Sequence, residues 1–235
     1  GSEMCIRDRS IKQEGGKDSR NKQIWYYRGA TDGRINGSDN WCITGIGIMK
    51  YVNPNDCAKW GGSIYQKVEP TLRYADILLM YAEALNNISE GTHYQVTSWD
   101  GSQTYDIFRD KEQMRRGVKP VRMRAGVPDY SDEVYENPKK FFEKIVHERQ
   151  IEFFAETQRY YDLRRWAIAP QMLKAGMRYG LDGLRVNPSF EEFNKPTLVN
   201  QPFKWDDKLY LMPVWSRSDM DELYSNPQLV QAPGY

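Results

Sequence analysis

The chain has 235 residues, which is long enough for one large domain or two small ones and for a sizeable core. Its 33 Lys and Arg nearly balance its 32 Asp and Glu, so the net charge of +1 gives no sign of a nucleic-acid groove or a polybasic membrane tether. Aromatic residues make up 13% of the chain, which suits a packed helical core or platforms for sugar rings. No apolar run approaches the roughly 20 residues that span a bilayer, so we expect no transmembrane segment.

The three cysteines do not follow a metal-binding pattern. Cys5, Cys42 and Cys57 have no C-x-x-C spacing, and the chain has only two histidines, so we expect no zinc site. Cys42 and Cys57 could pair in an oxidising compartment or remain small apolar side chains, and the sequence leaves both alternatives open.

The first quarter of the chain predicts little regular structure. Residues 1–23 are polar and have no apolar period, so we expect a disordered leader whose first ten residues are not native. The domain is therefore expected over 24–235. Gly, Asn and Asp are frequent up to residue 62, which predicts an irregular loop with a short strand pair near 24–27 and 46–51.

A helix is predicted over 72–86, with Thr71 as its cap. Apolar residues cover nearly its whole circumference, so we expect it to be central and buried. The charged residues Arg73, Asp76 and Glu83 are the exceptions, and each then needs a partner.

The segment after this helix is expected to alternate loop and helix. Residues 91–101 are polar and predict a loop. A helix is predicted over 105–116, ended by Gly117 in a left-handed cap and by Pro120. Residues 128–137 are expected to form a connector.

Asn137 and Pro138 predict the start of a long helix, since proline at the first helical position loses no hydrogen bond. The helix is expected to break near 157–159, to resume up to residue 169, and to stop at Pro170. Beyond it we expect a turn of helix at 171–177, irregular chain over 180–204, an extended segment at 208–213, and a last helix over 219–225 capped by Ser218. The pattern as a whole predicts a mainly α protein.

Charge and aromatic residues alternate most densely over 148–166. Glu148, Glu152 and Glu156 are four apart and form an acidic row on one face of a helix. Arginines follow at once, and the interleaved aromatic residues predict that part of the cluster is shielded from water, where charges need partners. We therefore predict a structural ion-pair network, in which Glu83 takes an arginine of this stretch, Arg159 being the first choice. Its expected members are Glu83, Glu148, Arg149, Glu152, Glu156, Arg159, Asp162, Arg164 and Arg165.

Four segments carry a family resemblance, in the order 73–86 (RYADILLMYAEALN), 121–128 (VRMRAGVP), 148–166 (ERQIEFFAETQRYYDLRRW) and 226–235 (NPQLVQAPGY). They resemble the signatures of the SusD/RagB family of outer-membrane nutrient-binding lipoproteins. The resemblance implies a SusD-like fold of divergent tetratricopeptide-like helix hairpins with long irregular loops and little β structure. Family members are considerably longer, so it also implies that this chain is the carboxy-terminal part of one.

Enzymatic chemistry is poorly supported by the residues. Glu148, Glu152 and Glu156 could in principle supply the acid and base of a glycosidase, but nearby arginines lower carboxylate pKa values, the opposite of what a general acid needs. His93 and His147 fit no catalytic triad. We expect no catalytic residue.

We also expect no metal ion or other cofactor. The segment 32–43 resembles a calcium loop but has Arg34 and Ile43 at its third and twelfth positions, where acidic residues are needed. A calcium site of another construction stays open.

Sugar binding is the remaining chemistry, because pyranose rings stack on Trp and Tyr while Asn, Asp and Arg reach their hydroxyls. The glycine-rich loop region supplies this mixture. For any single aromatic residue there, packing onto the core is an equally good explanation. The candidates are Trp25, Tyr27, Arg34, Asn36, Asp39, Asn40, Trp41 and Trp60.

The resemblance implies non-catalytic binding of an oligosaccharide at the surface of the bacterial outer membrane and its delivery to a SusC-like TonB-dependent transporter. It also implies anchoring through a lipidated N-terminus that this chain lacks. Two alternatives belong to other classes: a tetratricopeptide-like protein-interaction module without its own glycan site and, third, a glycoside hydrolase.

Overall fold

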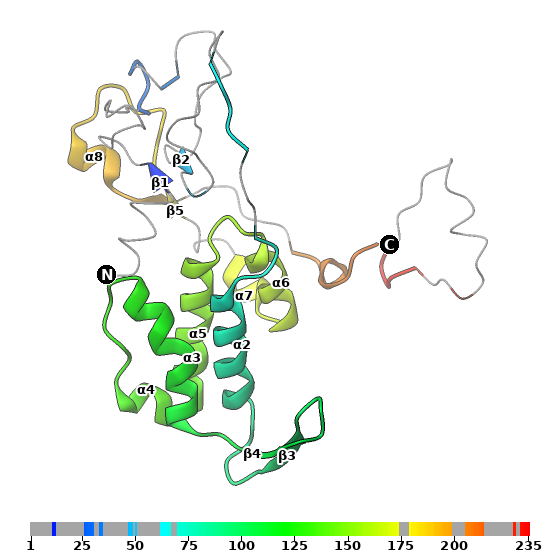
Figure 1. Cartoon of the computed structure of the whole chain (residues 1–235). Helices are drawn as coiled ribbons and strands as arrows, with labels where there is room; N and C mark the ends of the chain where they lie inside the picture. The colour runs from blue at the N-terminus through cyan, green and yellow to red at the C-terminus, as the bar shows by residue number, and fades with distance from the viewer. Residues whose placement is uncertain are drawn as a thin grey trace.

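The computed structural model describes residues 11–12, 26–30, 33–34, 47–48, 50, 62–66, 70–173, 179–198, 205–213, 228 and 231–235. Over these residues the fold is mainly α, as predicted (Figure 1). The helices are α2 (Tyr74–Asn86), α3 (Lys111–Arg124), α4 (Asp132–Glu136), α5 (Pro138–Glu152), α6 (Gln158–Arg165), α7 (Ala169–Leu173), α8 (Phe190–Asn194) and the 3-10 helix η1 (Asp207–Tyr210). The strands are β1 (Ile11–Lys12), β2 (Gly47–Ile48), β3 (Tyr94–Thr97), β4 (Thr104–Ile107), β5 (Tyr179–Gly180) and β6 (Thr197–Leu198).

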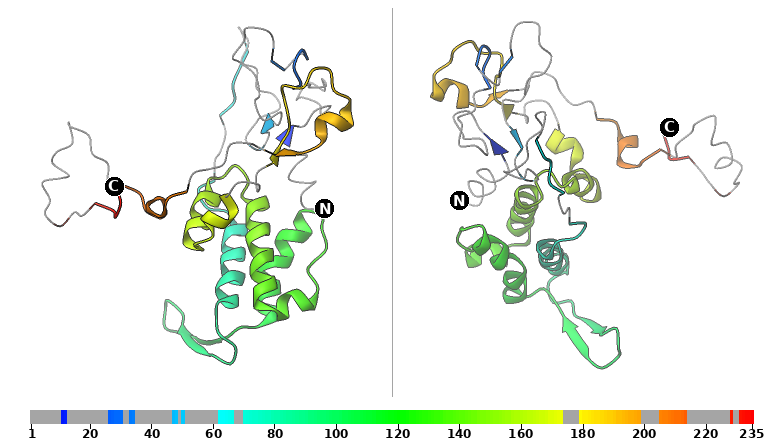
Figure 2. Two further views of the ribbon diagram at one scale, coloured as in Figure 1. Left: turned by 180° about the vertical axis from the view of Figure 1, so that it is seen from behind. Right: turned by 45° about the horizontal axis from the view of Figure 1, so that its top comes forward.

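The core lies between α2, α3 and α5, which pack side by side, with the β3–β4 hairpin at one end of the bundle and α6 and α7 at the other (Figures 1 and 2). Burying each large apolar side chain contributes about 1.5–3 kcal/mol. The core residues are Ala75, Leu79, Ala82, Leu85, Met114, Val118, Val121, Tyr135, Phe141, Ile145 and Phe153.

Helix α2 forms where it was predicted, but the expectation that it is buried all round is wrong. Ile77 is 49% exposed and Tyr74 is 75% exposed, so one face of the helix is open. The predicted Thr71 cap is also wrong, because Arg73 occupies the cap position and makes no side-chain cap hydrogen bond.

The predicted end of a helix at Gly117 is wrong, because α3 runs through Gly117 and Pro120 to Arg124. Gly117 lies against α2: a Cβ atom there would meet the carbonyl oxygen of Leu78 at 2.5 Å and the Cβ of Ala82 at 2.9 Å. The glycine therefore permits a close approach of two helices instead of ending one.

Two predictions before α3 are also wrong, since residues 94–107 form an antiparallel hairpin in place of a polar loop and a helix start. Tyr105 pairs with Val96, and apolar or aromatic residues alternate along both strands, which is the two-residue period of a strand. The hairpin turn is closed by Asp100, whose carboxylate accepts hydrogen bonds from the Ser98 hydroxyl (2.6 Å) and from the backbone N–H and hydroxyl of Ser102.

The long helix α5 begins as predicted. The Asn137 side chain accepts hydrogen bonds from the backbone N–H groups of Lys139 and Lys140, and Pro138 is the first helical residue. The break comes earlier than expected, since α5 ends at Glu152 and Thr157, with φ of 64°, precedes α6. Pro170 lies inside α7, so its expected role as a stop is wrong.

Short elements occupy several segments that were expected to be irregular or extended. The connector 128–137 contains α4, segment 180–204 contains α8 and β6, and η1 replaces the extended segment after Asp207. A capping box between Ser189 and Glu192 starts α8. Strand β2 pairs with β1, which lies within the expected leader, whereas residues 24 and 25 of the expected partner strand lie outside the described residues. The expected helix at 219–225 and the three cysteines lie outside the described residues.

Candidate functional site

Arg149 is the centre of the charged stretch and is 4% exposed. Its Nε donates to Asp162 Oδ2 (2.8 Å), its Nη1 to Asp76 Oδ1 (2.8 Å) and its Nη2 to Gln158 Oε1 (3.0 Å). One buried guanidinium thus joins α2, α5 and α6. Charge-assisted hydrogen bonds of this kind are stronger than neutral ones.

A second guanidinium lies beside it. Arg73 donates from Nη1 to Glu152 Oε1 (2.7 Å) and from Nε and Nη2 to the two carboxylate oxygens of Glu156 (2.9 and 2.8 Å). Burial acts to lower the pKa of Arg73, but its hydrogen bonds to Glu156 and Glu152 outweigh this effect and raise the pKa. The Phe153 ring packs against both guanidiniums, 5.0 Å from Arg73 and 4.9 Å from Arg149.

Glu83 pairs with Arg165, and the choice of Arg159 as its partner is wrong. Arg165 Nη2 donates to Glu83 Oε2 (2.7 Å), Nη1 to Oε1, and the Trp166 indole N–H also donates to Oε1 (2.7 Å). Arg159 instead donates to the Val146 carbonyl (3.2 Å), and burial lowers its pKa. The reason is geometric: positions six apart on a helix lie on different faces, so only one of these arginines can face α2.

The remaining members divide between carboxylate and backbone partners. Glu148 accepts hydrogen bonds from Arg122 Nη1 (2.5 Å) and from the Tyr130 hydroxyl (2.8 Å). Arg164 was expected to join the ion-pair network, but its described contacts show that this prediction is wrong. Its guanidinium donates hydrogen bonds to the backbone carbonyl groups of Leu209 and Tyr160.

The charged cluster, as the term is used below, therefore includes residues that the motif region does not contain. Charged residues at the N-cap of α2, on α2 and on α3 complete it, and the need of the buried ones for a partner was the signal in the sequence. Its members are Arg73, Asp76, Glu83, Arg122, Arg124, Glu148, Arg149, Glu152, Glu156, Asp162 and Arg165, with Lys50 beside Glu156.

Every carboxylate of the charged cluster has a cationic partner in the described part of the chain. In the described residues these carboxylates therefore serve as members of ion pairs. What the arrangement offers is a fixed connection between α2, α3, α5 and α6.

Two of the glycan-binding candidates, Tyr27 and Arg34, lie in the described residues 26–30 and 33–34. The Tyr27 ring packs edge to face on Phe193, with ring centroids 6.4 Å apart, and Phe193 is 1% exposed. The Arg34 carbonyl accepts a hydrogen bond from Gly29 N–H (3.3 Å). Tyr27 thus contributes part of its surface to packing. Trp25, Asn36, Asp39, Asn40, Trp41 and Trp60 lie outside the described residues.

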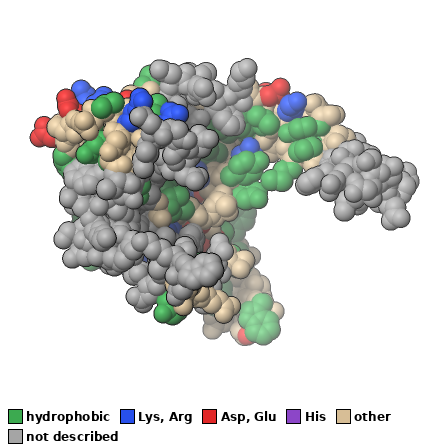
Figure 3. Space-filling model, turned by 90° about the horizontal axis from the view of Figure 1, so that it is seen from above, with side chains coloured by type: hydrophobic (Ala, Val, Ile, Leu, Met, Phe, Trp, Pro, Cys, Tyr) green, Lys and Arg blue, Asp and Glu red, His purple; other side chains and the backbone are tan. Residues whose placement is uncertain are grey.

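An exposed aromatic pair on α6 was not predicted. Tyr160 and Tyr161 are 43% and 56% exposed, with ring centroids 5.2 Å apart, and the Arg164 guanidinium lies 3.4 Å from the Tyr160 ring centroid. Consecutive helical residues cannot both face the same neighbour, which was the signal in the sequence. Hydrophobic side chains reach the surface at several other places, as the view from above shows (Figure 3).

No helix in the described residues is long and apolar enough to cross a membrane, and these residues contain no group of three or more His, Cys, Asp or Glu arranged to hold a metal ion.

The described part of the chain is thus a mainly helical fold in which buried charge pairs join the packed helices. A family model described as the SusD family matches residues 5–235, and the chain belongs to this family.

Known proteins are similar over most of this chain but are much longer. The chain is 30% identical over 134 residues to "SusD-like protein P2" of Formosa agariphila, which covers 56% of this chain and 22% of that protein. The selenomethionine structure of BT4246 is 26% identical with a TM-score of 0.71, covering 98% of this chain and 37% of that one. A SusD-like protein from Bacteroides fragilis is 26% identical with a TM-score of 0.66, covering 98% and 38%.

Proposed function

We propose that this chain is the carboxy-terminal part of a protein that binds an oligosaccharide without changing it chemically and delivers it to a SusC-like TonB-dependent transporter at the bacterial outer membrane. The observation that carries the proposal is the SusD family match over residues 5–235. A structurally similar chain, 21% identical, is described as a SusD-like carbohydrate-binding protein, which supports the fold.

The geometry of the described residues suits binding better than catalysis. The carboxylates over 148–166 that could have served as acid and base are joined to arginines or Lys50. Exposed aromatic side chains such as that of Tyr161 offer surface for sugar rings. We place the main glycan site in the glycine- and tryptophan-rich loops, with Trp41 and Trp60 as its aromatic platforms.

The test is a calorimetric titration of the full chain with a panel of neutral and acidic oligosaccharides, together with an assay for new reducing ends. Saturable heat without new reducing ends supports the proposal. Replacing Trp41 and Trp60 by Ala should weaken binding at least tenfold, whereas Trp99→Ala, in the hairpin turn, serves as a matched tryptophan control. New reducing ends would identify a glycoside hydrolase instead.

A second candidate function is a protein-interaction module, and the open face of α2 favours it. Tyr74, Ile77 and Tyr81 are spaced three and four apart and are 75%, 49% and 38% exposed. An apolar stripe on a helix is typical of a surface that packs against another protein segment. If no oligosaccharide in the panel binds, this function becomes the better account.

A further inference from the structure

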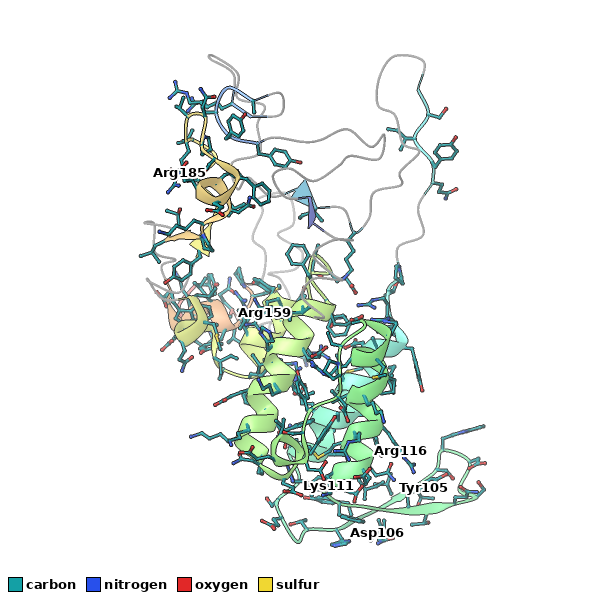
Figure 4. The ribbon with its side chains drawn as sticks, turned by 90° about the vertical axis from the view of Figure 1, so that its left-hand side faces the viewer. Tyr105, Asp106, Lys111, Arg116, Arg159 and Arg185 are labelled. Carbon is teal, nitrogen blue, oxygen red and sulfur yellow. The ribbon has the colours of Figure 1, made fainter. Side chains whose placement is uncertain are left out.

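The β3–β4 hairpin and the helix bundle border a half-open cavity that the predicted loop site does not include. Its volume is about 540 Å³, within the usual range of small-molecule sites. Figure 4 shows Tyr105 of the hairpin beneath Arg116 of α3. The cavity is lined by Tyr81, Leu85, Tyr105, Asp106, Ile107, Phe108, Asp110, Gln113 and Arg116.

Three aromatic side chains that line this cavity are partly exposed. Tyr81, Tyr105 and Phe108 are 38%, 49% and 37% exposed. They come from α2, from β4 and from the residue after β4, so they form walls on more than one side. A solvent-exposed aromatic side chain in the wall of a cavity is the kind of platform on which a sugar ring stacks.

The polar groups of the cavity are held in place and retain unused donors. The Tyr81 hydroxyl donates to Gln113 Oε1 (3.1 Å), which fixes the amide. Within residues 70–173 the amide nitrogen of Gln113 and the guanidinium of Arg116 have no hydrogen-bond partner. The walls are braced as well: Asp106 is bonded to His93 Nδ1 (2.8 Å), whose ring stacks on Phe108 at 4.7 Å.

The charge of the lining selects among sugars. Asp106 and Asp110 oppose the single guanidinium of Arg116, so the cavity has more negative than positive charge and repels an acidic sugar. Carboxylates that accept, together with amide and guanidinium groups that donate, match the hydroxyls of a neutral sugar.

We propose that this cavity is a second binding site for one neutral sugar ring of an oligosaccharide, separate from the main site in the glycine- and tryptophan-rich loops. The ring stacks on Tyr105 and Tyr81, and Gln113 and Arg116 donate hydrogen bonds to its hydroxyls. This inference rests on the proposed function, since it assumes that the protein binds glycans.

The test compares neutral oligosaccharides (maltoheptaose, cellohexaose, xylohexaose and mannohexaose) with an acidic one, hexagalacturonate, by calorimetry on the full chain. The loop variant, in which Trp41 and Trp60 are both Ala, should retain a weak site for a neutral oligosaccharide. In that background Tyr105→Ala should abolish the remaining binding, and Gln113→Ala should weaken it about threefold to tenfold, as expected for one lost hydrogen bond. Trp99→Ala, on the same hairpin but outside the cavity and 99% exposed, should leave it unchanged.

The outcomes separate the two proposals. If the loop variant binds nothing while Tyr105→Ala in the parent binds normally, the second site is refuted and the proposed function stands. Equal losses from Trp99→Ala and Tyr105→Ala would place the sugar on the hairpin surface and refute the cavity. If the unmodified chain binds no oligosaccharide, both proposals fail.

Discussion

Replacing Arg149 by Met tests whether the charged cluster holds the helices together. Methionine keeps much of the volume but removes every hydrogen bond that the guanidinium donates to Asp76, Asp162 and Gln158. The two carboxylates stay buried, at 6% and 3% exposure. Among the described residues, Asp162 retains one side-chain hydrogen bond, from Arg165 Nε (2.8 Å), whereas Asp76 retains only a long hydrogen bond from Gln158 Nε2 (3.4 Å).

The expected cost follows from these burials. Removing one partner of a buried ion pair costs about 3–5 kcal/mol, because the other charge is left without compensation. Since small domains are stable by only about 5–15 kcal/mol in total, a loss of this size is a large share. Arg149→Met should therefore lower the free energy of unfolding by about 3–5 kcal/mol.

The assay is urea unfolding followed by far-ultraviolet circular dichroism, with free energies extrapolated to water. The matched control is Arg124→Met, since the Arg124 side chain is 58% exposed and its partner Glu152 keeps Arg73. This control should cost less than about 1 kcal/mol, the usual value for an exposed pair. Changing Asp76 and Asp162 to Asn in the Arg149→Met background should restore part of the loss by removing the uncompensated charges.

The reasoning is refuted if Arg149→Met and Arg124→Met cost the same, or if the two Asn substitutions lower the stability further. Either result would mean that the buried guanidinium acts by filling space, and that the carboxylates do not depend on its charge.

Three further predictions concern single residues. The pKa of Asp100 is lowered to about 2, first by the hydrogen bond from Ser98, so its contribution to stability should be complete above the ordinary pKa of 3.8 and be lost as the pH falls from 3.8 towards 2. Ser98→Ala should raise the titration midpoint of the Asp100 carboxyl carbon measured by NMR, and an unchanged midpoint would refute the assignment. Gly117→Ala should destabilise by about 1–3 kcal/mol in urea despite a better helix propensity, because the new methyl group meets the backbone of α2; a more stable variant would contradict this close packing. Asn137→Ala should cost about 1 kcal/mol, measured in the same way, since the cap bonds at the start of α5 are lost, and no loss would argue against the cap.

Local chemistry made several features predictable. Asn137 and Pro138 mark the start of α5 because both act through the backbone of the next turn. The pattern of apolar residues over 72–86 predicts α2 for a similar reason, since these residues recur with the period of a helix. The four ordered motifs were sufficient to identify the SusD family, to which the chain belongs.

Neighbours distant in sequence overruled local signals elsewhere. Gly117 is a helix terminator by local preference, yet α3 continues through it because a glycine there lets α2 approach. Tyr105 was predicted to begin a helix, but cross-strand pairing with Val96 places it in a hairpin. Of the glycan-binding candidates, Tyr27 is the one that a described ring contact packs against a buried side chain, that of Phe193.

The sequence by itself determined that the charges of 148–166 need partners, because burying them among aromatic residues is unfavourable without compensation. It could not determine which partners they take. Arg165 and not Arg159 meets Glu83, and Arg149 meets Asp76 across 73 positions of sequence, because pairing depends on which faces of separate helices come together. That choice is made only when α2, α5 and α6 pack, since a side chain's direction on its helix is local while the position of the helix is not.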